Sequence, residues 1–189
     1  MKASIWKFIK EMIPVMLGVY LGFALNNYGE ERKELKQTEG FRTMLVNEIQ
    51  HNKKSIANGV DYHQKLGNRF DEILESDDLK KSFSTFTSSG LRPGFVSRSA
   101  YDTGIQTGLV QNFDLQLVQS LNRLYALQAK YDNFNNEVLS SVLSRKYPET
   151  TSEIKSMLIN MSMNMNDINS YEEELLSFYD GILNEMGED

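Results

Sequence analysis

Cysteine is absent from this chain of 189 residues. Its absence excludes disulfide bonds, thiolate metal sites and a cysteine nucleophile. Proline is scarce, with three residues at Pro14, Pro93 and Pro148, and this scarcity leaves room for very long helices. A concentrated basic patch is also missing, and the net charge is −6. Because neutralisation of phosphates dominates affinity for nucleic acids, we expect no nucleic acid among the partners.

Patterns typical of catalysis and of cofactor binding are missing as well. The sequence offers no readable set of nucleophile, base and acid, no Gly-rich phosphate loop and no zinc-ligand spacing. The histidines, His51 and His63, are 12 positions apart, not at the i, i+4 spacing that places two imidazoles on one side of a metal. We therefore predict no catalytic residue, no metal site and no cofactor, and a protein that is not an enzyme.

Methionines gather in residues 157–165, and soft thioethers select Cu(I). On a helix, however, Met157, Met161 and Met165 share one face, whereas Met163 points away. Unbranched Met also fills irregular cores well. The spacing favours core packing, with a copper site as the alternative.

The longest apolar run, Met12–Leu25, has 14 residues and would make about 21 Å of helix. A bilayer core needs about 30 Å, which is reached when the run is extended back to Ile5. Trp6 and Tyr28 then stand where interfacial aromatics are expected. No small-residue cleavage site follows the run. We predict one retained transmembrane helix within residues 5–28, over a cleaved signal peptide or a soluble core helix.

One face of this predicted helix carries Pro14, Gly18, Gly22 and Asn26, which recur every four residues. Gly18 and Gly22 form a small-xxx-small pair, which lets another helix approach closely in lipid. Asn26 could hydrogen-bond across such a contact. We predict a packing face for a second copy of the chain or for another membrane protein.

Helical periodicity continues after the apolar run. A 3–4 alternation from Leu35 to Ile73 is apolar at seven of its twelve positions, which suits a helix packed along one face. This pattern predicts that the first helix runs to about residue 75, with Gly59 and Gly67 as places for a bend or break.

Residues 76–113 are the least regular part of the chain, and they are expected to hold short helices. Asp114 is a cap for a long helix that reaches about residue 147. Thr150 and Glu153 form a capping-box pattern at the start of the last helix. The predicted fold class is all-α: an N-terminal transmembrane helix, residues 1–28, continues into a bundle of long antiparallel helices, up-down-up, within residues 29–189. The short helices should fill the end of the bundle far from the N-terminus.

The densest polar and aromatic group of the irregular part comprises Arg92, Arg98, Tyr101 and Asp102. Arg98 and Asp102 are four apart on a short helix and can form an ion pair. The alternative is a pocket for an anionic ligand or peptide, because irregular segments often carry recognition.

Two stretches, "LGFALNNYGEERKE" at 21–34 and "SAYDTGIQTGLVQNFDLQLVQSLNRLYALQAKY" at 99–131, together resemble an uncharacterised bacterial family of short membrane proteins. Members have one N-terminal transmembrane helix and an all-helical soluble domain. Tyr28 stands where that family often has Trp. The resemblance implies fold and membrane attachment, and it supplies no chemistry.

The function predicted from these observations is that of a non-enzymatic single-span membrane protein. It would act as an interaction module or as an accessory subunit of a membrane complex, with the lipid bilayer and a second copy or another membrane protein as partners. The alternative is a membrane-anchored sensor that binds a small ligand in its membrane-distal region. The expected location is the bacterial inner membrane. Lys2, Lys7 and Lys10 precede the span, and Arg32, Lys33, Lys36 and Arg42 follow it, so the positive-inside rule gives nearly a tie; the short basic N-terminus before the span favours the periplasmic side for the soluble domain.

Overall fold

The computed structural model describes the backbone of residues 2–86, 90–144 and 146–188, and the side chains of these residues from Met12 onward. Its regular elements are helices, and the described residues contain no strand, so the predicted all-α class is confirmed. The elements are α1 (Lys2–Leu74), α2 (Leu79–Ser84), α3 (Ser99–Thr107), the short 3-10 helix η1 (Leu109–Asn112), α4 (Leu115–Ser144) and α5 (Thr151–Glu185).

The chain divides into two compact units, residues 1–43 and residues 44–189. The first unit consists of the N-terminal part of α1. Every large apolar side chain between Met12 and Tyr28 is exposed there. We name Met12–Leu25 the apolar segment.

The predicted transmembrane helix over residues 5–28 is not supported by the structure. In the part of the chain whose side chains the structure describes, no helix is both long enough and apolar enough to cross a membrane. The side chains of residues 5–11 lie outside the described part. The apolar segment alone would make only about 21 Å of helix before the polar Asn26 and Asn27.

The prediction that the first helix continues to about residue 75 is confirmed, because α1 ends at Leu74. A break at Gly59 or Gly67 is ruled out, since helix continues through both, and the alternative of a bend there stays a prediction. Both glycines face α5 instead. A Cβ at Gly67 would lie 3.3 Å from the Cβ of Met165. The small residues therefore allow α5 to pack closely against α1.

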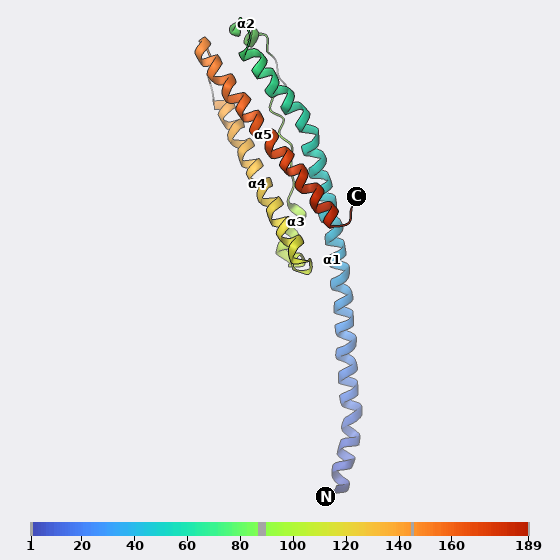
Figure 1. Ribbon diagram of the computed structural model, residues 1–189. Coiled ribbons are helices and arrows are strands. Elements are labelled where there is room, and N and C mark those ends of the chain that lie inside the picture. The colour runs from blue at the N-terminus through green and yellow to red at the C-terminus, as the bar shows by residue number, and fades with distance from the viewer. Residues whose placement is uncertain (1, 87–89, 145, 189) are drawn as a thin grey trace. The chain divides into compact units, whose positions relative to one another are not determined.

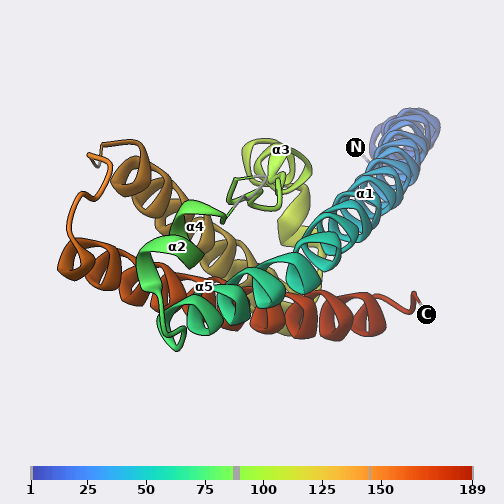
Figure 2. The same cartoon turned by 90° about the horizontal axis from the view of Figure 1, so that it is seen from above.

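In the second unit, α5 is antiparallel to α1. His63 of α1 contacts Glu172 of α5, and Asp71 further along α1 accepts a hydrogen bond from Ser162, earlier in α5. Helix α5 is also antiparallel to α4, along which it lies (Figures 1 and 2).

Helices α1 and α4 run in the same direction, which corrects the predicted up-down-up arrangement. Glu48, early in the part of α1 that belongs to this unit, accepts a hydrogen bond from Tyr125 of α4. Tyr131, further along α4, reaches Glu172 beside His63. The chain returns from the end of α1 through an irregular stretch before α3, as Figure 1 shows, so α4 starts again at the end of the unit where Glu48 lies.

The helix starts follow local sequence signals. Asp114 accepts a hydrogen bond from the backbone N–H of Gln116 at the start of α4. Thr150 and Glu153 form the complete capping box of α5, with each side chain bonded to the other residue's backbone N–H. Both predicted caps are confirmed.

The core of the second unit lies between α1, α4 and α5. Met161 and Met165 are buried in it, whereas Met163 is exposed, as expected for methionines that pack a core. The largest fully buried side chains are Leu45, Ile49, Ile56, Leu121, Leu124, Tyr131, Leu158, Met165, Ile168, Leu175, Tyr179 and Ile182.

Candidate functional site

Polar side chains on one side of α1 hold the irregular stretch that precedes α3. We name residues 90–98 the strap, because they join distant parts of the second unit without regular structure. The α1 residues that bond to the strap are Glu48, Asn52, Tyr62 and His63.

Glu48 caps α3 from another helix. Its Oε2 accepts hydrogen bonds from the hydroxyls of Ser97 and Ser99, at 2.9 and 3.0 Å, and from the backbone N–H of Ala100 at 2.8 Å. Its Oε1 accepts one from the hydroxyl of Tyr125 at 2.8 Å. Because α3 has no side-chain cap of its own, this carboxylate satisfies donors at the helix N-terminus and complements the helix dipole.

Asn52 lies one helical turn after Glu48 and is fully buried. Its amide nitrogen donates to the carbonyl of Ser97 at 2.6 Å, and its amide oxygen accepts from the Ser97 N–H at 2.8 Å. One side chain thus satisfies both backbone groups of a strap residue that has no sheet or helix partner.

His63 and Glu172 form a buried charged pair, and neither side chain is exposed. His63 Nδ1 lies 2.9 and 3.0 Å from the two oxygens of Glu172. Its Nε2 donates to the carbonyl oxygen of Leu91 in the strap, which can only accept. The ring is therefore an imidazolium that donates from both nitrogens.

The pKa of His63 agrees with this assignment. Burial lowers that pKa, but the hydrogen bond and charge of Glu172, together with the carbonyls of Leu91 and Arg92, outweigh burial and raise it above its ordinary value. In its charged form, which the raised pKa favours, the pair joins α1, α5 and the strap through charge-assisted hydrogen bonds.

Tyr131 of α4 completes this cluster. Its hydroxyl donates to Glu172 Oε1 at 2.9 Å and accepts from the backbone N–H of Gly94 at 3.0 Å. Burial, followed by the charge of Glu172, raises the pKa of the Tyr131 hydroxyl. Gly59 gives the cluster room, since a Cβ there would lie 3.1 Å from Glu172 Oε1.

This arrangement is suited to holding the fold together and not to chemistry on a substrate. His63 and Glu172 are sealed from solvent, and their polar atoms already bond to one another, to Tyr131 and to Leu91. Buried polar networks of this kind specify one packing of a core. The cluster is a clamp on the strap.

The structure separates the members of the predicted ligand group. Arg98 pairs with Asp102, with its Nη2 atom 2.8 Å from Asp102 Oδ1, and both side chains are partly exposed. Tyr101 is buried, stacks on Tyr125 with ring centroids 4.1 Å apart and donates to Asn122. The predicted ion pair between Arg98 and Asp102 is therefore confirmed.

Arg92, the fourth member, lies elsewhere along the strap. Its guanidinium stands over the ring of Tyr62, 5.3 Å from the ring centroid, and it lines a surface hollow with Tyr62, Gly94 and Phe95. Its φ of 47° is unusual for a residue other than glycine. That these four residues bind a ligand stays a prediction.

The position of α3 corrects one expectation about this region. The short helices were expected at the end of the bundle far from the N-terminus. The start of α3 instead bonds to Glu48, only four residues after Met44, the first residue of the second unit. A pocket beside Arg98 would therefore not lie at the far end.

The predicted packing face on the apolar segment is open. A Cβ at Gly18 or at Gly22 would have no atom within 4 Å apart from the adjacent residues and the nearby backbone of its own helix. Asn26 donates from its amide to Glu30 on the same helix at 3.0 Å. Pro14 lies inside the helix. That this face packs against another helix stays a prediction.

The clamp residues were missed by reasoning from sequence, although part of their signal was visible. Asn52, Gly59 and His63 occupy positions of the apolar 3–4 pattern of α1 where a core residue is expected. Polar or small residues at such positions indicate buried hydrogen bonds or close helix contacts. Glu48 and Glu172 gave no such signal, because their partners lie 41 or more positions away in sequence.

Neither histidine is placed for shared metal binding, since His51 is exposed and His63 is engaged with Glu172. Among the described residues, no group of three or more His, Cys, Asp or Glu side chains is arranged to hold a metal ion. Comparison with protein-family models, with curated proteins and with solved structures finds no match for this chain.

Proposed function

We propose that the protein is a non-enzymatic interaction module of a bacterial membrane, in which the apolar segment inserts into lipid and residues 44–189 form a rigid helical bundle that contacts a partner. One observation carries the proposal: every large apolar side chain from Met12 to Leu25 is exposed. Such a continuous apolar surface on a protein marks a site of interaction with protein or membrane.

The distribution of these side chains favours lipid over a single partner helix. They lie on all sides of the helix and not on one stripe, as Val15, Leu17 and Val19, with 54–64% exposure, illustrate. A helix that is apolar all round belongs in surroundings that are apolar all round. Burial of each large apolar side chain would contribute about 1.5–3 kcal/mol.

The bundle supplies the contact surface of the proposed module. Its end opposite Glu48 exposes apolar side chains on both neighbouring helices, among them Leu143 near the end of α4 and Met163 in the first half of α5. Exposed apolar residues at the same end of two adjacent helices suit a protein partner. A second copy or another membrane protein would fill that role.

Carbonate extraction of membranes tests the insertion. We expect the full chain to stay in the membrane pellet. A Leu17→Asp, Leu21→Asp double variant should move to the supernatant, because charges inside lipid are costly. Leu143→Asp, at an even more exposed apolar site on the bundle, should leave the protein in the pellet. Release of the unmodified chain by carbonate would contradict the proposal.

A further inference from the structure

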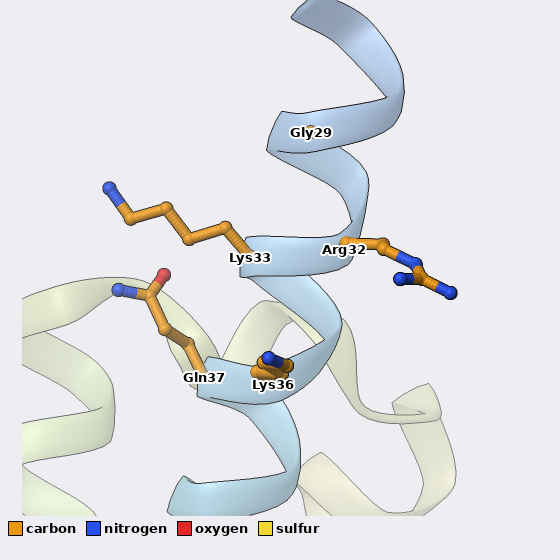
Figure 3. Close-up of a pocket in the computed structure, with 5 residues that line it drawn as sticks. All are labelled: Gly29, Arg32, Lys33, Lys36 and Gln37. Carbon is orange, nitrogen blue, oxygen red and sulfur yellow. The ribbon is translucent and has the colours of Figure 1, made fainter. Parts of the chain in front are cut away.

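A surface hollow lined by basic side chains lies directly after the apolar segment. Gly29 opens it because it has no side chain, and Arg32, Lys33, Lys36 and Gln37 line the rest. Figure 3 shows Lys33 and Arg32 extending outward on either side of Lys36. We name this group the basic hollow. No carboxylate lines it.

The charges of this stretch are sorted around the helix. At about 100° per residue, Arg32, Lys33 and Lys36 fall on one side together with Gly29. Three glutamates of the same stretch fall on the other side, at positions 30, 31 and 34. Among the described residues, no ion pair joins Arg32, Lys33 or Lys36 to a carboxylate. The positive charges of this side are therefore not neutralised by ion pairs within the described part of the chain and can bind an anion.

The distance from the apolar segment matches the headgroup layer of a bilayer. Gly29 lies about 6 Å beyond Leu25 along the helix, and Arg32 about 10 Å beyond it. The layer that borders the hydrocarbon core is about 5–8 Å thick on each side. The Arg32 and Lys33 stems are long enough to reach back along the helix to phosphate groups in that layer. Lys36, about 16 Å beyond Leu25, adds positive charge within about a Debye length of it.

Tyr28 stands between the apolar segment and the basic hollow. The guanidinium of Arg32 lies over its ring, 5.2 Å from the centroid. Tyrosine is enriched at the boundary between lipid and water. A cation–π contact there holds the arginine beside the boundary.

We infer that the basic hollow binds the phosphate group of anionic lipid headgroups, and that it gives the inserted protein a preference for anionic bilayers. This inference rests on the proposed function, because lipid must first surround the apolar segment. A lipid headgroup is favoured over free phosphate or the acidic side of a second copy, because the hollow continues directly from the lipid-embedded surface through Tyr28. Arg32, Lys33 and Lys36 would supply the charge.

Flotation with lipid vesicles tests the inference. The full chain is diluted from neutral detergent into vesicles of phosphatidylcholine alone or of phosphatidylcholine mixed with phosphatidylglycerol. The compared variants are Arg32→Gln, Lys33→Gln, Lys36→Gln and, as the matched control, Glu30→Gln, Glu31→Gln, Glu34→Gln. Each basic residue near an anionic surface strengthens binding roughly fivefold. We expect at least about tenfold stronger binding to the anionic vesicles for the unmodified chain and for the control.

The outcomes separate the inference from the proposed function. Loss of the anionic preference in the basic variant alone, with binding to neutral vesicles kept, supports the inference. Equal binding of the unmodified chain to both vesicles, or a preference that survives in the basic variant, overturns it and leaves insertion standing. No binding to either vesicle overturns the proposed function as well.

Two further arms exclude the other occupants. Inorganic phosphate, added at constant ionic strength, should leave the preference unchanged, and its loss would assign the hollow to free phosphate. The assembled mass in detergent should be the same for the basic variant, the control variant and the unmodified chain. If both variants dissociate an assembly and no anionic preference exists, the hollow is covered by a second copy and the inference is wrong.

Discussion

His63 Nδ1 of α1 lies 2.9 Å from Glu172 Oε1 of α5, and the two residues are 109 positions apart in sequence. The other ring nitrogen of His63 donates to Leu91 in the strap. One imidazolium therefore joins α1, α5 and the connection that returns the chain to the start of the bundle. Because the pair is buried, its contribution to folding depends on the protonation of His63.

The first prediction concerns pH. The pKa of His63 in the folded chain is raised above its value in the unfolded chain. A raised pKa contributes stability that is fully present below the unfolded pKa, about 6.5 for His, and that is lost as pH rises through the folded value. We expect the free energy of unfolding, measured with urea, to fall from about pH 6.5 upward, by at most about 1.4 kcal/mol per pH unit for one proton.

Two other titratable groups face this pair, Tyr131 from α4 and Tyr62 from α1, and the backbone carbonyl of Arg92 in the strap also contacts His63. The matched control is therefore the exposed His51. His51→Gln should keep the pH dependence, and His63→Gln should remove it and cost about 3–5 kcal/mol, because it leaves Glu172 without its charged partner. Equal pH profiles for the two variants would contradict the assignment.

The second prediction concerns Glu48. Glu48→Gln replaces an acceptor oxygen by a donor that faces the donors of Ser97, Ala100 and Tyr125. We expect a loss of roughly 2–3 kcal/mol of stability, typical of hydrogen bonds to charged groups. Hydrogen exchange at the Ala100 amide should quicken more than exchange in the middle of α5. Glu174→Gln, at an exposed site, should change neither quantity.

The third prediction contrasts two glycines inside α1. Gly40→Ala should stabilise the helix by about 0.5–1 kcal/mol, because Ala is the better helix former and nothing lies within 4 Å of its Cβ. Gly59→Ala should destabilise by about 1–3 kcal/mol, since its Cβ would lie 3.1 Å from Glu172 Oε1 and 3.3 Å from His63 Cε1. Thermal unfolding of the two variants measures the difference. Stabilisation by Gly59→Ala would show that the clamp can shift without cost.

The fourth prediction concerns assembly. The open positions at Gly18 and Gly22 suit a close approach of a second helix. Gly18→Ile with Gly22→Ile should leave membrane insertion intact and reduce the assembled mass seen by blue-native electrophoresis or crosslinking. Val15→Ile with Val19→Ile, on the bulkier side, is the matched control. An unchanged mass for the glycine variant would show that this face is not an interface.

Local signals in the sequence predicted much of the fold. Asp114 before α4 and the Thr150–Glu153 pair before α5 act within one helical turn, so their effect can be read from neighbouring residues. The 3–4 pattern likewise predicted the end of α1 near residue 75. These features follow from propensity and capping alone.

The direction of α4 and the whole clamp could not be read in this way. Glu48 caps α3 across 52 positions, and the Asn52 amide satisfies the backbone of Ser97 across 45. Both contacts join residues far apart in sequence, and such contacts leave no periodic pattern in the sequence. For this reason no local pattern indicates that the strap returns along α1. Gly59 was taken for a bend because its role depends on Glu172, which only the packed structure places beside it.

The most direct test of the proposed function measures whether the apolar segment lies in lipid. The chain has no cysteine, so Leu17→Cys and Leu143→Cys each give a unique site for an environment-sensitive dye in the full chain. With vesicles added, the dye at position 17 should shift its emission to the blue and be quenched by lipids brominated on their acyl chains. The dye at position 143 should show neither change. Emission at position 17 that stays typical of water, and that brominated lipid does not quench, would contradict membrane insertion.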